Sequence, residues 1–135
     1  MTTTIDEVKE SFETSPFFSL VGFEITRFEA GHVTLELEVK EKLLNANGTL
    51  HGGVHASMID IILGMAIRSE TKTRCTTINL NTHYLAPVSS GVITAKGRIL
   101  QQGYKIVTAE GELFDEAGQM IAKGTGSYKL IRSKK

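Results

Sequence analysis

The sequence predicts an α+β domain in which a curved antiparallel sheet packs against one long helix. Residues 52–69 form a mostly apolar stretch without proline, long enough for about five helical turns. Residues 32–39 (His-Val-Thr-Leu-Glu-Leu-Glu-Val) alternate apolar and polar side chains, as a strand with one wet face does. Further strand-like runs follow the helix one after another, which is typical of α+β rather than α/β domains.

The elements expected before the long helix are short. Residues 4–14 read as a surface helix that Thr4 could cap, and Ser15-Pro16 would end it. Residues 17–21 are expected to form an apolar plug, and residues 23–28 the first strand. Residues 32–39 then follow as the second strand, and residues 40–50 as a loop.

After the long helix, four more strand-like runs are expected, joined mostly by turns of hairpin length. Gln102-Gly103 and Asp115–Gly118 carry turn signals. The expected runs cover residues 75–84, 92–100, 106–114 and 120–130. With the two earlier runs, this predicts five or six strands in total.

Composition limits the classes of protein that the chain can be. Its 135 residues suit one domain, which we expect to span residues 1–135 with residues 1–19 as an N-terminal helix and plug. Fifteen Lys and Arg balance fifteen Asp and Glu, which argues against a general nucleic-acid binder or a membrane-surface protein. Cys75 is the only cysteine, so the chain has no intrachain disulfide and no cysteine cage for a metal.

The location of the protein is predicted from what its sequence lacks. The first ten residues have neither the basic start nor the apolar core of a signal peptide. No apolar run approaches the roughly 20 residues that span a bilayer. We therefore expect a soluble, cytoplasmic protein.

Asp60 is the residue that points most directly to function. It is the only charged residue between Lys42 and Arg68, and it lies within the apolar run 58–63 of the long helix. An unpaired carboxylate on such a helix costs several kcal/mol, and no basic residue stands three or four positions away to pair with it. Asp60 could be structural, but the glycine-rich polar segment 45–53 just before the helix favours an active site.

This segment resembles a known family. The spacing Asn-x-x-Gly-x-x-His-Gly-Gly-x₆-Asp, from Asn45 to Asp60, is similar to that of the hotdog-fold acyl-CoA thioesterases. Their subgroup includes the phenylacetate-pathway thioesterase and thioesterase superfamily member 2. Residues 76–87 also look like the strand that follows in that family, and the resemblance extends over about residues 20–130.

The resemblance implies roles for particular residues. The Gly52 amide and the Asn45 side chain would polarise the thioester carbonyl, with Asp60 as general base or nucleophile. Thr77, where some relatives carry serine, would orient the water or the carboxylate. The CoA moiety would contact Tyr84 and the turn formed by Gln101, Gln102, Gly103, Tyr104 and Lys105.

The residues themselves support this chemistry. A helix N-terminus offers unpaired N–H groups and partial positive charge, and Gly52 and Gly53 let a substrate approach their amides closely. Gly52 and Asp60 are eight positions apart, about 12 Å along a straight helix, so one helix cannot place both at one thioester carbon. We therefore predict at least a homodimer with shared sites, and the family implies that dimers pair into tetramers.

A metal site is the main alternative for the histidines. His51 and His55 have the i, i+4 spacing of metal ligands, but the residues between them lack the acid of the zinc-protease motif. We expect no metal and no cofactor beyond the CoA of the substrate, and we expect His51 to fix the loop or orient substrate.

Two other functions and one pocket complete the predictions. A non-catalytic acyl-CoA-binding or sensing module would gain nothing from Asp60, and the motifs of hotdog hydratases are not found. The glycines of Gly124-Thr125-Gly126 are better read as a bulge or a place of close approach than as a phosphate-binding loop. An apolar acyl pocket could be lined by Phe17, Phe18, Phe23, Met58, Leu63 and Met65.

Overall fold

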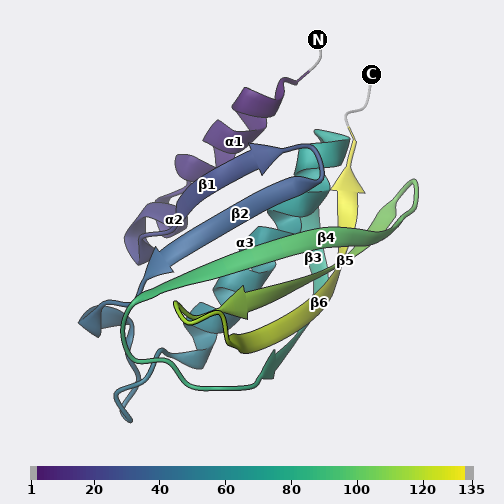
Figure 1. Cartoon of the computed structure of the whole chain (residues 1–135). Coiled ribbons are helices and arrows are strands. Elements are labelled where there is room, and N and C mark those ends of the chain that lie inside the picture. The colour runs from purple at the N-terminus through teal and green to yellow at the C-terminus, as the bar shows by residue number, and fades with distance from the viewer. Residues whose placement is uncertain (1–2, 133–135) are drawn as a thin grey trace.

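The computed structural model describes residues 3–132 and confirms the α+β hotdog architecture, with six strands and one long helix (Figure 1). Three helices and a short 3₁₀ turn accompany the strands. In chain order the elements are α1 (Ile5–Glu13), α2 (Pro16–Val21), β1 (Glu24–Glu29), β2 (His32–Glu38), η1 (Glu41–Leu43), α3 (Gly52–Thr71), β3 (Arg74–Tyr84), β4 (Val92–Gln102), β5 (Ile106–Phe114) and β6 (Met120–Ile131).

The six strands form one antiparallel sheet in the order β1-β2-β4-β5-β6-β3. The sheet curves around α3, and α1 lies beside β1 (Figure 1). The hairpins β4–β5 and β5–β6 agree with the predicted turns. β3 is different, because it pairs with β6 at the far edge and residues 85–91 carry the chain back across to β4.

The N-terminal segment begins with a capped helix, as predicted. The Thr4 hydroxyl accepts from the Glu7 amide at 3.1 Å, and the Glu7 carboxylate accepts from the Thr4 amide at 2.9 Å. Residues 17–21, expected as an apolar plug, belong to the short helix α2. Pro16 suits the first turn of a helix, and Gly22 ends it in the left-handed conformation with φ of 101°.

A row of three glycines lets α3 lie close against the sheet. Gly97, Gly111 and Gly124 are register partners on β4, β5 and β6. A Cβ added to Gly124 would lie 2.5 Å from Cγ2 of Ile59, which is closer than atoms in contact can come. The prediction that the glycines at 124–126 mark a close approach is therefore confirmed.

The expected acyl pocket is wrong for Met58, Leu63 and Met65, which have no exposed surface. Phe17 is exposed, whereas the other five are buried in the main core between α3 and the sheet: Phe18, Phe23, Met58, Leu63 and Met65. Apolar residues occur all around α3, so their sequence pattern did not show which of them face the sheet. No helix within residues 3–132 is long and apolar enough to cross a membrane.

Candidate active site

Asp60 lies half-buried on the flank of α3, where two hydroxyl groups hold its carboxylate. Oδ1 accepts one hydrogen bond from Thr77 Oγ1 at 2.9 Å and another from the Tyr128 hydroxyl at 2.7 Å. The Tyr128 oxygen also lies 3.1 Å from the Asp60 carbonyl oxygen. Oδ2 receives no hydrogen bond from residues 3–132, so it is the oxygen that can face a water or a substrate.

Strand register brings the two hydroxyls together. Thr77 on β3 is the direct partner of Tyr128 on β6, and paired residues of antiparallel strands point to the same face of the sheet. That face meets α3 at Asp60. The register shifts just beyond Thr77, between Thr77 and Asn79, and such irregularities often re-aim side chains beside active sites.

Tyr128 is the member of this cluster that sequence reasoning missed. Burial, and then the neighbouring Asp60 carboxylate, raise the pKa of Tyr128 far above its usual value. The hydroxyl therefore stays protonated and serves Asp60 as a donor. Its only sequence signal was a tyrosine on a strand next to the glycines at 124 and 126, and that signal does not name its partner.

A cavity of about 170 Å³ adjoins the carboxylate. Apart from Asp60, Thr77 and Tyr128, its walls come from α1, α3 and β3: Phe12, Ile61, Gly64, Arg68 and Cys75. Burial raises the pKa of Cys75 to about 11, so the thiol is not ionised near neutral pH and is a poor nucleophile. Asp60 is thus the candidate reactive group of this cavity, and its catalytic role stays a prediction.

The N-terminus of α3 forms the second half of the predicted site. His51 caps the helix, and its Nδ1 accepts from the Gly53 amide at 2.8 Å. The Tyr84 hydroxyl donates to the Gly52 carbonyl at 3.0 Å. Within residues 3–132 no acceptor is found for the Gly52 N–H, so this amide, rather than that of Gly53, can bind a substrate oxygen.

Asn45 holds the loop that leads to this helix. Its Oδ1 accepts from the Asn47 amide at 2.8 Å and the Thr49 amide at 3.2 Å. Its Nδ2 donates to Thr49 Oγ1 at 3.0 Å, which leaves one N–H of the side-chain amide for another acceptor. The role of Asn45 in polarising a carbonyl stays a prediction.

The histidines are engaged in local contacts. The His55 ring is buried against Tyr84, with ring centroids 5.5 Å apart, and its Nδ1 lies 3.2 Å from the His51 carbonyl oxygen. Across residues 3–132, no three side chains of His, Cys, Asp and Glu gather as metal ligands would. That no metal is needed stays a prediction.

Several predicted site residues lie far apart within one chain. Gly52 and Asp60 begin and end a span of two turns of α3, about 12 Å along its axis. The turn at residues 103–105 neighbours the Arg74 end of β3 through β6, because Ile106 pairs with Lys129 and Lys129 with Thr76. Tyr84 stands at the other end of β3, about 33 Å from Arg74 along an extended strand.

Comparison with known proteins identifies the family. Residues 47–122 match the thioesterase superfamily, a segment that contains the Gly52 amide, Asp60 and Thr77. The chain belongs to this family. It is 34% identical to human acyl-coenzyme A thioesterase 13, with 96% of each chain covered. It is 30% identical to the medium/long-chain acyl-CoA thioesterase YigI of Escherichia coli, with 85% of each covered.

Solved structures of the superfamily have the same fold. Zebra fish thioesterase superfamily member 2 superposes with a TM-score of 0.83 at 29% identity, covering 95% of this chain and 99% of that one. The Escherichia coli PaaI protein of the phenylacetic acid degradation operon superposes with a TM-score of 0.88 at 18% identity, covering 96% and 94%. At 18% identity the second likeness concerns the fold alone.

Proposed function

We propose that the protein hydrolyses acyl-CoA thioesters to a free acid and CoA. The observation that carries the proposal is the Asp60 carboxylate, which is held on one oxygen by Thr77 and Tyr128 and borders a cavity of about 170 Å³. Relatives of similar length that share 30–34% identity are named acyl-CoA thioesterases. Binding alone would not require a positioned carboxylate beside the cavity.

Two mechanisms use the same geometry. As a general base, Asp60 takes a proton from water while the water oxygen adds to the thioester carbon, and collapse of the adduct expels the CoA thiolate. As a nucleophile, Asp60 adds to that carbon itself, and the adduct breaks its C–S bond, expels the CoA thiolate and leaves an anhydride, which water then hydrolyses. In both cases the Gly52 N–H and the Asn45 amide stabilise the oxyanion, for which one donor contributes roughly 3–4 kcal/mol.

The site is shared between two copies of the chain in this proposal, and β3 offers the surface for it. Within the described residues, the outer edge of β3 has no strand partner, and the side chain of Ile78 is exposed there. Two-fold antiparallel pairing of two β3 strands would set the Tyr84 end of one beside the Arg74 end of the other.

This arrangement would bring together what one chain keeps apart. The Tyr84 hydroxyl donates a hydrogen bond to the Gly52 carbonyl. The N-terminus of α3 in one copy therefore lies beside Tyr84 and would face the other copy. Asp60 is bonded to Thr77, near the opposite end of β3. The predicted CoA-binding groups, Tyr84 and the turn at residues 101–105, would approach each other in the same way.

The test is thiol release from aryl, short-chain and long-chain acyl-CoA. We expect hydrolysis by the wild type, and a loss of 10²-fold or more in kcat for Asp60→Asn, on the order of the loss of a general base. Asp60→Asn should fold normally, which circular dichroism checks. Binding of acyl-CoA without thiol release would indicate a sensing module instead, and normal turnover by the folded variant would refute the role of Asp60.

Thr77 provides a matched pair of variants. Thr77→Ser keeps the hydroxyl that donates to Asp60, so its kcat should stay within a few-fold of wild type. Thr77→Val keeps the shape of the side chain but removes the donor. The hydrogen bond to the Asp60 carboxylate, worth roughly 1.5–3 kcal/mol, is then lost, and kcat should fall below that of Thr77→Ser. Equal activity of the two variants would show that Thr77 does not position the carboxylate.

A further inference from the structure

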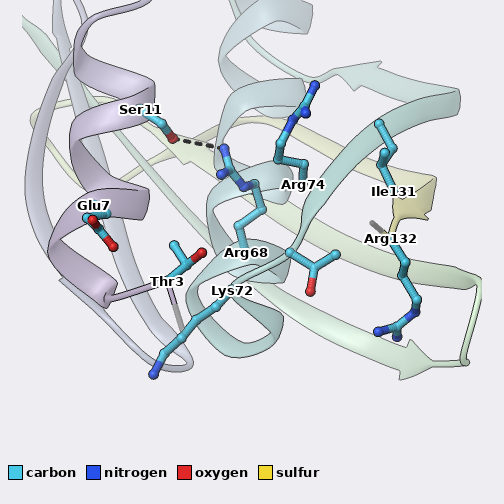
Figure 2. A pocket seen from close by; sticks show the side chains of 9 residues that line it. Thr3, Glu7, Ser11, Arg68, Lys72, Arg74, Ile131 and Arg132 are labelled. Atoms are coloured by element: carbon cyan, nitrogen blue, oxygen red, sulfur yellow. Dashed lines mark hydrogen bonds between the residues drawn. The ribbon is translucent and has the colours of Figure 1, made fainter. Parts of the chain in front are cut away.

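A second, larger pocket lies where α1 meets the C-terminal end of α3 and the outer ends of β3 and β6 (Figure 2). Its volume is about 540 Å³. Four cationic side chains line it: Arg68, Lys72, Arg74 and Arg132. The one carboxylate in its lining, that of Glu7, is engaged by the Thr4 amide at 2.9 Å.

The four cations have no carboxylate partners within residues 3–132, since every ion pair found there involves other basic residues. Arg68 donates from Nη1 to Ser11 Oγ at 3.0 Å, as Figure 2 shows, while its buried Nε has no hydrogen-bond partner among the described residues. The formal net charge of the chain is zero, so this concentration of positive charge is local. Such a set of unpaired cations attracts an anion.

Stabilisation of helix α3 explains only part of the cluster. Arg68 and Lys72 interact favourably with the C-terminus of the helix, but Arg74 and Arg132 lie on or beside strands. Lys72 also has a φ of 52°, a left-handed conformation in which glycine would be less strained. A lysine at this position therefore costs stability that a glycine would not, which suggests that its charge is used.

Two contacts connect the pocket to the proposed site. Arg68 lines both this pocket and the cavity at Asp60, so the two hollows adjoin. Arg132 donates to the Tyr104 carbonyl at 3.0 Å, and its guanidinium carbon lies 4.2 Å from the centroid of the Tyr104 ring. Tyr104 is 72% exposed and belongs to the turn expected to contact CoA, so a flat base could stack beside it.

We propose that this pocket binds phosphate groups, and that these are the phosphates of the CoA portion of the substrate, held by Arg74, Arg132 and Lys72 while Arg68 borders the thioester cavity. Guanidinium groups match phosphate oxygens in pairs. An acyl chain would need an apolar lining, and Ile131 is the one apolar side chain among the described residues that line this pocket. The assignment to CoA rests on the proposed function, but phosphate binding does not.

The kinetic test compares two thioesters of one acyl group, the CoA ester and the N-acetylcysteamine ester, which has no phosphate. For Arg74→Gln/Arg132→Gln, KM for the CoA ester should rise about 10-fold or more while kcat stays within about two-fold. Kinetic constants for the phosphate-free ester should not change. Arg27→Gln removes an exposed arginine that pairs with Glu29 on β1 and should leave both substrates unaffected. Equal effects on the two esters would overturn the assignment to CoA.

A binding test separates phosphate from CoA. Isothermal titration calorimetry with adenosine 3′,5′-bisphosphate and with inorganic pyrophosphate should show binding to the wild type that the double variant loses. Lys72→Gly is the control for misfolding. It should weaken phosphate binding and yet raise the melting temperature, so that weaker binding cannot be due to loss of the fold. No binding by the wild type would overturn the proposal.

The two tests also distinguish this proposal from the function on which it rests. Bisphosphate that binds without competing against acyl-CoA would assign the pocket to a separate phosphate ligand and overturn the CoA assignment. If the wild type hydrolyses neither thioester, the proposed function fails, and the calorimetry still decides whether the pocket takes phosphate.

Discussion

Asp60→Ala and Asn45→Ala each remove one half of the proposed site, and together they test whether the site is shared. Each variant alone should be inactive, because every site in its homodimer carries the same defect. An Asp60→Ala subunit still offers Asn45 and the Gly52 amide, and an Asn45→Ala subunit still offers Asp60. When the two subunits pair, both defects fall in one site and the other site is intact.

The size of the recovery follows from two-fold symmetry. For a fraction x of one variant, random pairing gives a fraction x(1 − x) of intact sites. At equal amounts about a quarter of wild-type activity should return, and at a ratio of three to one about 19%. Pairing of dimers into tetramers leaves these values unchanged, since the sites are counted by dimer.

The assay unfolds the two variants together, refolds them by dilution and follows thiol release from acyl-CoA. Wild-type protein carried through the same cycle defines full activity. Variants that are mixed without unfolding show how far subunits exchange on their own. Native mass spectrometry measures the fraction of mixed dimers in each sample.

One result would refute the reasoning. If mixed dimers form in the expected amount but no activity returns at any ratio, each site is built within one chain. The separation of about 12 Å along α3 between Gly52 and Asp60 would then have to be bridged within that chain, and the shared-site proposal would be wrong.

Three further predictions concern pH, packing and metals. Burial lowers the pKa of His55, so the unfolded chain takes up its proton first and the free energy of unfolding should decrease as pH falls below about 6.5. His55→Gln should flatten this dependence in urea titrations from pH 5 to 7.5, whereas the exposed His32→Gln should not. Gly124→Ala should lower the free energy of unfolding by about 1–3 kcal/mol through its contact with Ile59, while Gly64→Ala, with its nearest contact at 3.8 Å, should be neutral or stabilising in thermal melts. EDTA should leave thiol release unchanged, and a loss that zinc or manganese restores would show that a metal takes part.

Much of the fold is encoded in patterns between near neighbours. The helix cap at Thr4, the alternation in β2 and the turn after Phe114 lie within spans of a few residues, and each prediction was confirmed. Asp60 stood out because a charge within an apolar helix conflicts with its surroundings. The motif from Asn45 to Asp60 pointed to the family that residues 47–122 then matched.

The groups around Asp60 were harder to predict, since they come from distant parts of the chain. Tyr128 is 68 positions from Asp60 and meets it only because β6 lies between β5 and β3. The basic pocket likewise joins α1 to the ends of β3 and β6. The spacing of residues along the chain does not predict such contacts between distant segments.

The sequence by itself therefore determined the α+β class, the limits of most helices and strands, and the residue at the centre of the proposed chemistry. Only the tertiary structure decided that β3 is an edge strand, which hydroxyls hold Asp60, and that five residues of the expected acyl pocket belong to the core. The physical reason is that strand register depends on how the whole sheet packs on α3. A slip of one residue between β3 and β6 would turn Thr77 and Tyr128 to opposite faces, although every local pattern would stay the same.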